Sequence, residues 1–413
     1  MSIPVIPKVH TAGSDVIRLG FIGCGNRGTG ACREALLTSP QMKLTAIGDL
    51  FEERLTRALS NLEKYEDTEE RIDVPPEHQF TGFDAYAGVM ATDCDAVILA
   101  TPPHFRPIHY AAAVAAGKHV FMEKPFCVDA TGYRSLIESN IVAKSKQLNV
   151  VVGLQRRHQQ NYLEGIERLC SGEIGDVAMA RVYFNVQNGA RAGWLKPDGM
   201  GELEYQIRHW AVFCWLGGDF LVEQTCHEID VANWAFDAHP QRAWGMGDRQ
   251  VRRGPGDGDI WDRFAIEYEY SGGRRLFAQG RQMLGAWDHV SDNFTGTHGT
   301  MTIGTGAWGY GTATPRDLKS SSTRQSNPYQ QEHIDWVAGI TGAAPYRMEG
   351  DYGAASSMTA VLGRMAAYTG REVTWDEAVA DTRHVAPSKY TWDATPPVHP
   401  DETGIYPSPK QGL

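Results

Sequence analysis

The sequence predicts an α/β protein of two domains. A parallel sheet covered by helices on both faces is followed by an α/β domain with a large, open, mostly antiparallel sheet. Three observations support this prediction. The chain has 413 residues, which exceeds the size at which one hydrophobic core usually divides. Short apolar segments alternate with helical segments as far as residue 153. Longer segments of alternating polar and apolar residues then follow.

The first part of the chain alternates between buried strands and helices, as a parallel sheet requires. Apolar runs bounded by glycine, proline or polar residues predict strands at 16–23, 43–49, 95–100, 119–123 and 150–152. The segments between them predict helices at 29–37, 52–64, 108–116 and 130–146. The segment 66–82 has acidic residues, two prolines and little apolar periodicity, so we interpret it as a surface insertion.

The second part of the chain has strands of a different kind. Residues 177–184 and 264–270 alternate polar and apolar side chains, which is typical of an antiparallel sheet with one covered face. Proline and polar residues mark both ends of the chain as extensions. The predicted organisation is an N-terminal arm at 1–15, a first domain at 16–153, a second domain at 154–380 and a C-terminal tail at 381–413.

The charge and cysteine content limit the partners and the compartment. The net charge is −11 at pH 7, so the chain lacks the basic field that nucleic acid or an anionic membrane surface would need. Its seven cysteines include no C-x-x-C pair, as expected of thiols in a reducing compartment. No signal peptide and no apolar stretch of bilayer length is visible. We therefore expect a cytoplasmic protein with no nucleic-acid or membrane partner.

A glycine-rich turn joins the first predicted strand to the first helix. Its sequence is Gly23-Cys24-Gly25-Asn26-Arg27-Gly28, the G-x-G-x-x-G pattern of dinucleotide-binding turns. The first glycine permits the tight turn, the second lets the backbone approach a pyrophosphate, and the third lets the helix pack on the sheet. Free N–H groups at the helix start attract the phosphates. The first domain is therefore expected to be a Rossmann dinucleotide-binding domain.

Asp49 closes the second strand, 21 residues after Gly28. An acid at this place accepts hydrogen bonds from the adenosine ribose hydroxyls and repels a 2′-phosphate, which favours NAD over NADP. The alternative interpretation is an ordinary strand–turn–helix connection, in which Asp49 caps the helix at 52–64.

The fourth predicted strand ends in Glu123-Lys124-Pro125. Ligands bind beyond the carboxyl ends of the strands in open parallel sheets, so Lys124 can point at a substrate beside the nicotinamide. Taken alone, the tripeptide could equally be a surface loop with a solvated lysine. It occurs, however, at the end of Ala-Gly-Lys-His-Val-Phe-Met-Glu-Lys-Pro at 116–125, and Ala-Thr-Pro-Pro-His precedes it at 100–104. With the glycine-rich turn, these motifs closely resemble the Gfo/Idh/MocA oxidoreductase family.

The resemblance continues at 223–230 and 363–377, so it covers the chain from about Val16 to Glu377. It implies a Rossmann domain joined to an α/β domain, a bound nicotinamide dinucleotide, and a homodimer or homotetramer built on the open sheet. It also implies carbohydrate-like substrates such as sugars, glycosides or inositols. The cofactor contacts expected from these motifs are Gly23, Gly25, Asn26, Arg27, Gly28, Asp49, Thr101, Pro102, His104, Glu123 and Lys124.

Residues 221–236 predict one helix that carries Glu223 and His227 on the same face, one turn apart. Oxidation of a carbinol needs a base for the hydroxyl proton while hydride leaves carbon. His227 has a suitable intrinsic pKa, and Glu223 can orient it or hold its charge. The resemblance places the strand-end Lys124 opposite, which implies the catalytic set Lys124, Glu223 and His227.

Two features qualify this set. The family's acid is usually Asp, whereas this chain has Glu223, which leaves its role open between orienting the histidine and binding substrate. For His227 the alternative is a satisfied core histidine. The string His227-Glu228 is not H-E-x-x-H, because residue 231 is valine, so no zinc site and no other metal site is expected.

Three further residues are candidates for substrate contact. Arg157 follows the fifth strand, where the resemblance puts an arginine near substrate or cofactor. Trp194 and Arg208 lie in a loop-rich stretch, where an aromatic face would suit a sugar, although plain packing is the alternative. The expected substrate contacts are Lys124, Arg157, Trp194, Arg208, Glu223 and His227.

The predicted function is that of an NAD-dependent oxidoreductase, which transfers hydride to or from a carbinol or keto carbon of a sugar, glycoside or cyclitol. One alternative is a redox-assisted glycosidase or lyase that holds NAD tightly and needs no net turnover of it. A second is a non-catalytic regulator that senses dinucleotide. The presence of both Lys124 and His227 disfavours the regulator.

Overall fold

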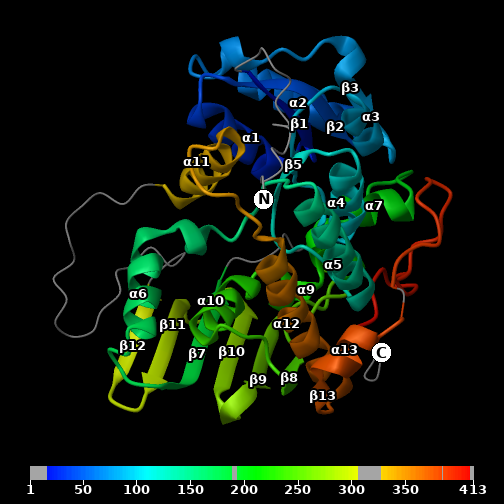
Figure 1. Ribbon diagram of the computed structural model, residues 1–413. Helices are drawn as coiled ribbons and strands as arrows, with labels where there is room; N and C mark the ends of the chain where they lie inside the picture. The colour runs from blue at the N-terminus through cyan, green and yellow to red at the C-terminus, as the bar shows by residue number, and fades with distance from the viewer. Residues whose placement is uncertain (1–15, 188–192, 306–326, 384, 410–413) are drawn as a thin grey trace.

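The computed structural model describes residues 16–187, 193–305, 327–383 and 385–409. These residues form two sheets, each with helices packed against it (Figure 1). The all-parallel sheet lies in the upper part of Figure 1 and the mixed sheet in the lower part. The predicted α/β fold class, with a Rossmann domain and a second, mainly antiparallel sheet, is confirmed.

The first sheet has, within the residues described, six parallel strands in the order β3-β2-β1-β4-β5-β6. They are β1 (Ile17–Ile22), β2 (Met42–Asp49), β3 (Gln79–Thr81), β4 (Ala96–Leu99), β5 (His119–Met122) and β6 (Val150–Val152). From β1 the sheet grows in one direction to β2 and β3 and in the other to β4, β5 and β6, so the strand order reverses between β1 and β4. Open α/β sheets bind ligands at such a reversal, outside the carboxyl ends of the strands.

Helices cover both faces of this sheet. The helices on one face are α1 (Asn26–Thr38), α2 (Glu52–Glu63) and α11 (Pro328–Thr341). Those on the other are α3 (Ala85–Ala91), α4 (Arg106–Ala115) and α5 (Ala130–Ser145). Figure 1 shows α11 beside α1, although more than 280 residues separate them. Because Trp336 and Ile340 of α11 share a core with β1, packing crosses the predicted domain boundary at residue 153.

The second sheet has, in the described part of the chain, seven strands in the order β12-β11-β7-β10-β9-β8-β13. They are β7 (Val177–Val186), β8 (Arg242–Asp248), β9 (Arg263–Glu269), β10 (Arg275–Gln282), β11 (His289–Gly296), β12 (Thr300–Thr305) and β13 (Val373–Thr374). The β7–β10 pair is parallel and the other neighbours are antiparallel.

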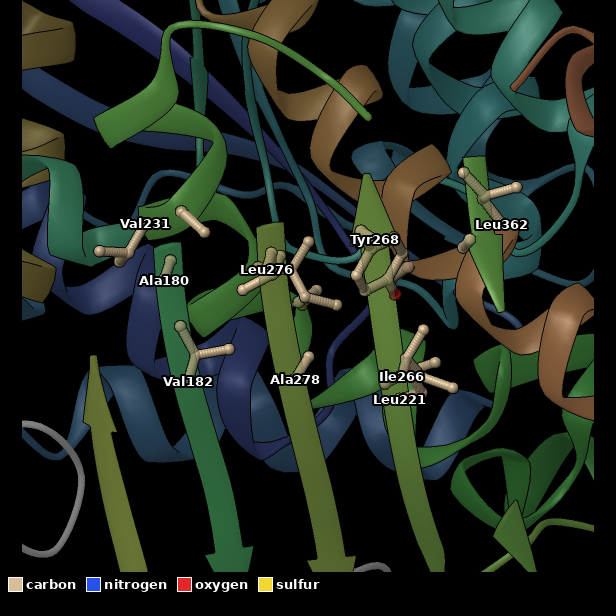
Figure 2. Close-up of a cluster of buried hydrophobic side chains, with 14 of the residues drawn as sticks. Ala180, Val182, Leu221, Val231, Ile266, Tyr268, Leu276, Ala278 and Leu362 are labelled. Atoms are coloured by element: carbon tan, nitrogen blue, oxygen red, sulfur yellow. The ribbon is translucent and has the colours of Figure 1, made fainter. Parts of the chain in front are cut away.

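Three helices bury one face of the second sheet: α9 (Asp219–Glu223), α10 (Cys226–Phe236) and α12 (Gly350–Thr369). Figure 2 shows Leu221, Val231 and Leu362 of these helices against apolar side chains of the central strands. The remaining α-helices are α6 (Gln160–Cys170), α7 (Glu202–Arg208), α8 (Cys214–Gly217) and α13 (Trp375–Ala380). The short 3-10 helices are η1 (Glu69–Arg71), η2 (Pro76–His78), η3 (Pro103–Phe105), η4 (Gln155–His158), η5 (Trp210–Val212) and η6 (Ser271–Gly273).

The structure corrects two predictions of secondary structure. The segment 66–82 is more than a surface insertion, because its end forms β3, which pairs with β2 at the sheet edge. This strand has only three residues, two half-buried and one exposed, which is too few to give an apolar run. The helix predicted at 221–236 is broken at Gln224 into α9 and α10. The break lets Thr225 sink against β10, where a Cβ at Gly280 would lie 2.3 Å from its hydroxyl oxygen.

No helix in the described ranges is both long and apolar enough to cross a bilayer.

Candidate active site

The glycine-rich turn is shaped by close backbone contacts at its first and third glycines. Gly23 has φ +96°, and a Cβ there would lie 2.5 Å from the carbonyl carbon of Ala100. A Cβ on Gly28 would lie 2.1 Å from the carbonyl oxygen of Gly23. A Cβ on Gly25 would meet no atom within 4 Å. The fold therefore requires glycine at Gly23 and Gly28, whereas Gly25 keeps space open for a ligand.

Helix α1 starts directly after Gly25, three residues earlier than predicted. Its first turn has no side-chain cap, so its N–H groups remain available to an anion. The open space at Gly25 and the start of this helix together fit the pyrophosphate of a dinucleotide.

Asp49 at the end of β2 ties the turn to the second strand. Its carboxylate accepts hydrogen bonds from the backbone N–H of Cys24 at 2.6 Å and of Phe51 at 2.9 Å. Burial raises the pKa of Asp49, although these backbone hydrogen bonds act in the opposite direction. Asp49 does not cap α2, whose N-cap is Phe51. Because Asp49 also lines the cavity described next, it remains placed to meet a ribose.

A cavity of about 450 Å³ opens beyond the carboxyl ends of β1, β2 and β4. The expected cofactor residues that line it are Gly23, Gly25, Asn26, Arg27, Gly28, Asp49, Thr101 and Pro102. Its volume is in the range of small-molecule sites. We call it the dinucleotide cleft.

Two expected cofactor residues, His104 and Glu123, do not line the cleft but contact residues that do. His104 is buried, and its Nε2 lies 2.6 Å from the hydroxyl oxygen of Tyr390. Glu123 accepts a hydrogen bond from Arg27 Nε at 2.5 Å. Arg27 also pairs with the buried Glu332 of α11 at 3.3 Å. These contacts hold in place the residues that line the cleft.

Lys124 and Glu223 come together although 99 residues separate them in the chain. Lys124 Nζ donates to Glu223 Oε1 at 2.9 Å and to the backbone carbonyl oxygen of Glu223. That carbonyl is available because α9 ends at Glu223. Burial lowers the pKa of Lys124, but the charge and hydrogen bond of Glu223, with the charge of Glu123 and the thiol of Cys226, together outweigh it. The pKa is therefore raised and the ammonium stays charged.

His227 lies one residue into α10 and is buried, with 8% of its surface exposed. Its Nδ1 is buried without a hydrogen-bond partner among the residues described. Burial and the charges of Lys124, Arg156 and Arg27 lower the pKa of His227 well below its ordinary value. The imidazole is therefore neutral at physiological pH, the state in which it can accept a proton.

One expected role of Glu223 is to orient His227, but in the structure its carboxylate has other partners. Both carboxylate oxygens of Glu223 are engaged elsewhere, with Lys124 and with the side-chain amide of Gln224. Because the helix is broken at Gln224, the one-turn spacing of a continuous helix does not apply.

Arg157, a predicted substrate contact, makes a two-pronged ion pair with the buried Asp230 of α10. Its Nε and Nη2 lie 2.9 and 2.8 Å from the carboxylate oxygens. Its guanidinium also stacks 3.8 Å from the ring centre of Tyr352. The neighbouring Arg156 pairs with the buried Glu228. Both arginines therefore join η4 to α10, directly behind His227.

Within the part of the chain that the structure describes, Arg208 and Trp194 make no contact with Lys124 or His227. Arg208 lines the dinucleotide cleft, 3.6 Å over the ring of Phe51, and pairs with Glu53 and Glu204. The Trp194 ring packs at 5.2 Å from that of Tyr205. Arg208 therefore lies at the dinucleotide cleft, and its contact with substrate stays a prediction.

Sequence reasoning missed several residues that line the cleft or support it. The cleft residues are Phe51, Arg54, Phe83, Phe105 and Tyr390. Phe51 follows Asp49 directly after the strand end, and this spacing was a usable signal. Tyr390 lies in the proline-rich tail, which carried no pattern that pointed to the cleft. Among the residues described, no group of three or more His, Cys, Asp or Glu side chains could hold a metal ion.

Two family sequence models match most of the chain. Residues 17–154 match the GFO/IDH/MocA oxidoreductase model, described as an NAD-binding Rossmann fold. Residues 162–302 match the model of the GFO/IDH/MocA C-terminal domain.

Individual relatives are more distant. An inositol 2-dehydrogenase of Pseudomonas savastanoi is 31% identical over 203 residues, 49% of this chain and 55% of the relative. The chain thus spans about half the length of that relative. A scyllo-inositol 2-dehydrogenase (NAD(+)) of Bacillus subtilis is 24% identical over 70% of this chain and 74% of its own.

Among solved structures, the scyllo-inositol dehydrogenase of Lactobacillus casei with NAD(H) and scyllo-inositol aligns with a TM-score of 0.64. It is 18% identical, over 87% of this chain and 99% of that one. The aldose-aldose oxidoreductase of Caulobacter crescentus gives 0.65 at 16% identity, over 87% and 99%. At these identities the likeness shows the fold.

Proposed function

The chain belongs to the GFO/IDH/MocA family of oxidoreductases, and on this premise we propose that it is an NAD-dependent dehydrogenase of cyclitols, sugars or glycosides. The proposal rests above all on one observation: Lys124, whose ammonium Glu223 holds at 2.9 Å, directly follows Glu123, the partner of the cleft residue Arg27. The charge of Lys124 also contributes to lowering the pKa of His227. The relatives named for inositol dehydrogenation support a cyclitol as the first substrate to test.

NAD supplies the hydride acceptor at the nicotinamide ring when it is bound. The residues of the glycine-rich turn, the start of α1 and Asp49 would hold its pyrophosphate and ribose. The absence of any Cβ at Gly25 leaves room for this approach.

Lys124 would hold the reacting oxygen. An ammonium has three donor hydrogens, and Glu223 takes two of them. The third is left for the substrate oxygen, where a positive charge stabilises the developing alkoxide. Glu223 is in this scheme a positioning residue that keeps Lys124 charged and aimed.

His227 would accept the hydroxyl proton in oxidation and return it in reduction. With Nδ1 buried, Nε2 is the nitrogen left to face the substrate. The neutral state of the imidazole means that no proton has to leave before the reaction starts.

The proposal also includes a homodimer or homotetramer and a cytoplasmic location. The seven cysteines are all unpaired, which fits a reducing compartment. Size-exclusion chromatography with light scattering tests the assembly.

A substrate screen tests the activity. The purified chain is mixed with inositols, free sugars and glycosides, each with NAD or NADP, and the absorbance of reduced nicotinamide is followed. We expect a cyclitol or sugar to give net reduced NAD, and we expect His227→Ala and Lys124→Ala each to lower the rate at least about 100-fold. Full activity in either variant would refute the proposal. So would a chain that binds NAD but oxidises none of the inositols, sugars and glycosides tested. Consumption of a glycoside without net reduced NAD would favour the redox-assisted alternative.

A further inference from the structure

The C-terminal tail reaches the dinucleotide cleft. In Figure 1 the tail, drawn in red, runs beside α7. Tyr390 lines the cleft, and its hydroxyl oxygen lies 2.6 Å from Nε2 of His104, in the loop after β4. Its ring packs on Phe105 at 5.3 Å between centres. The tail therefore forms part of the wall of this site.

An aromatic cluster joins the tail to the end of the second strand. The ring of Trp392 lies 4.8 Å from Phe83 and 5.8 Å from Phe51, and both phenylalanines line the cleft. Phe51 stands two residues after Asp49, the residue placed to meet the adenosine ribose. Aromatic faces beyond that ribose suit a purine ring, because every base offers a π-face for stacking.

The tail is held on both sides of these aromatic residues. Before them, Arg134 of α5 donates to the carbonyl oxygen of Asp381 at 2.9 Å. After them, Gln206 of α7 donates to the carbonyl oxygen of Val398 at 2.7 Å. The residues between, 385–397, form no helix or strand in the described structure. We call this segment the C-terminal strap.

The strap belongs to no helix or strand, and it is held mainly by its aromatic side chains. Trp392 is 50% exposed, and Lys389 pairs with Asp393 of the strap itself. Segments without regular backbone hydrogen bonding can open locally at a lower free energy than that of global unfolding.

We infer that the C-terminal strap is the outer wall of the adenosine subsite, and that bound dinucleotide leaves the enzyme only when the strap lifts. This inference rests on the proposed function and extends it. Release of reduced cofactor, which limits turnover in many enzymes, would here be controlled by residues 385–397. The same strap would retain NAD through purification.

Release of NADH from the full-length chain tests this inference. The fluorescence of bound NADH is followed in a stopped-flow instrument after mixing with excess ADP-ribose. Trp392→Ala is compared with Trp287→Ala, another exposed tryptophan, which packs on His289 of the second sheet. Trp392→Ala is expected to release NADH about 2- to 12-fold faster, the range for loss of one aromatic pair, because Trp392 packs on the cleft residues Phe51 and Phe83. The control is expected to match the wild type.

A second measurement needs no variant. Hydrogen exchange of residues 385–397 in the wild-type chain is expected to slow when NADH is bound. Unchanged exchange, or equal release rates in Trp392→Ala and wild type, would overturn the inference while leaving the proposed function intact. A wild-type chain that does not bind NADH would instead refute the proposed function itself.

Discussion

The ammonium of Lys124 and the carboxylate of Glu223 lie 2.9 Å apart, one at the end of β5 and the other at the last residue of α9. The pair joins the parallel sheet to the helices that cover the second sheet. Glu223 accepts two hydrogen bonds from Lys124, which fix the position of the ammonium and favour its charged form.

Replacing Glu223 by Gln is therefore expected to change the alkaline side of the pH–activity profile. In the wild type burial lowers the pKa of Lys124, but Glu223, through its charge and hydrogen bond, is the main contributor to a net rise, so the ammonium persists above its ordinary pKa. Without that charge, burial dominates and the pKa falls. We expect kcat in Glu223→Gln to decline at a lower pH than in the wild type.

The conservative variant Glu223→Asp provides the control, because it keeps the charge and shortens the side chain by one methylene. It should restore most of the alkaline profile. An alkaline limb at the same pH in all three proteins would show that Glu223 does not set the protonation of Lys124.

A second prediction concerns the acid side. Burial and the charges of Lys124, Arg156 and Arg27 lower the pKa of His227 far below its ordinary value. Oxidation should therefore show no acid limb near the ordinary histidine pKa of about 6.5. His227→Ala should lower kcat about 10²- to 10⁴-fold, the usual contribution of a general base. An acid limb at an ordinary histidine pKa that disappears in His227→Ala would contradict the lowered pKa.

The same shift has a consequence for stability. A histidine whose pKa is lowered by folding binds more protons when unfolded, so its contribution favours folding above the unfolded pKa and is lost as the pH falls through it. We expect the melting temperature of the wild type to fall more steeply below about pH 6.5 than that of His227→Gln. Parallel pH–melting curves for the two proteins would exclude this linkage.

The parts of the site that were predicted from sequence depend on local pattern. The roles of Gly23 and Gly28 follow from the turn itself, and the position of Lys124 follows from the strand that precedes it. Contacts between distant segments had no such signal. Arg157 and Asp230 are 73 residues apart, and His104 and Tyr390 are 286 apart.

The break in the helix at 221–236 was also not predictable from its own residues. Its apolar spacing is compatible with one continuous helix. The interruption depends on Thr225, which is fully buried in the space that Gly280 leaves on β10. The packing of Thr225 against β10 therefore determines the relative orientation of Glu223 and His227.

A third prediction separates folding from cofactor binding within the glycine-rich turn. Gly25→Ala adds a methyl group where no atom lies within 4 Å, and Gly25 has φ −72°, which alanine adopts readily. Stability should change by less than about 0.5 kcal/mol. NAD affinity should fall at least about tenfold, because the methyl group occupies the approach to the pyrophosphate.

Gly28→Ala is the matched variant. Its Cβ would lie 2.1 Å from the carbonyl oxygen of Gly23, so α1 must move away from the sheet and the melting temperature should fall. Thermal unfolding and isothermal titration with NAD measure both quantities. Unchanged NAD affinity in a fully folded Gly25→Ala protein would show that the pyrophosphate binds elsewhere.

The fourth prediction asks whether Arg157 binds substrate or supports the fold. Its guanidinium holds Asp230, whose Oδ1 also accepts from Ser356 at 2.7 Å, and only 1% of the Asp230 side chain is exposed. Arg157→Met would leave a buried carboxylate without its cation, which costs about 3–5 kcal/mol. We expect that loss in urea unfolding, with KM of the folded protein changed less than about threefold.

The double variant Arg157→Met, Asp230→Leu removes the stranded charge as well as its partner. Since replacing a buried ion pair by apolar residues is often close to neutral, it should recover much of the lost stability. The two roles of Arg157 give opposite patterns. A supporting role predicts a large loss of stability that the double variant repairs, at nearly constant KM. A substrate contact predicts a large rise in KM in both variants, which the second substitution cannot repair.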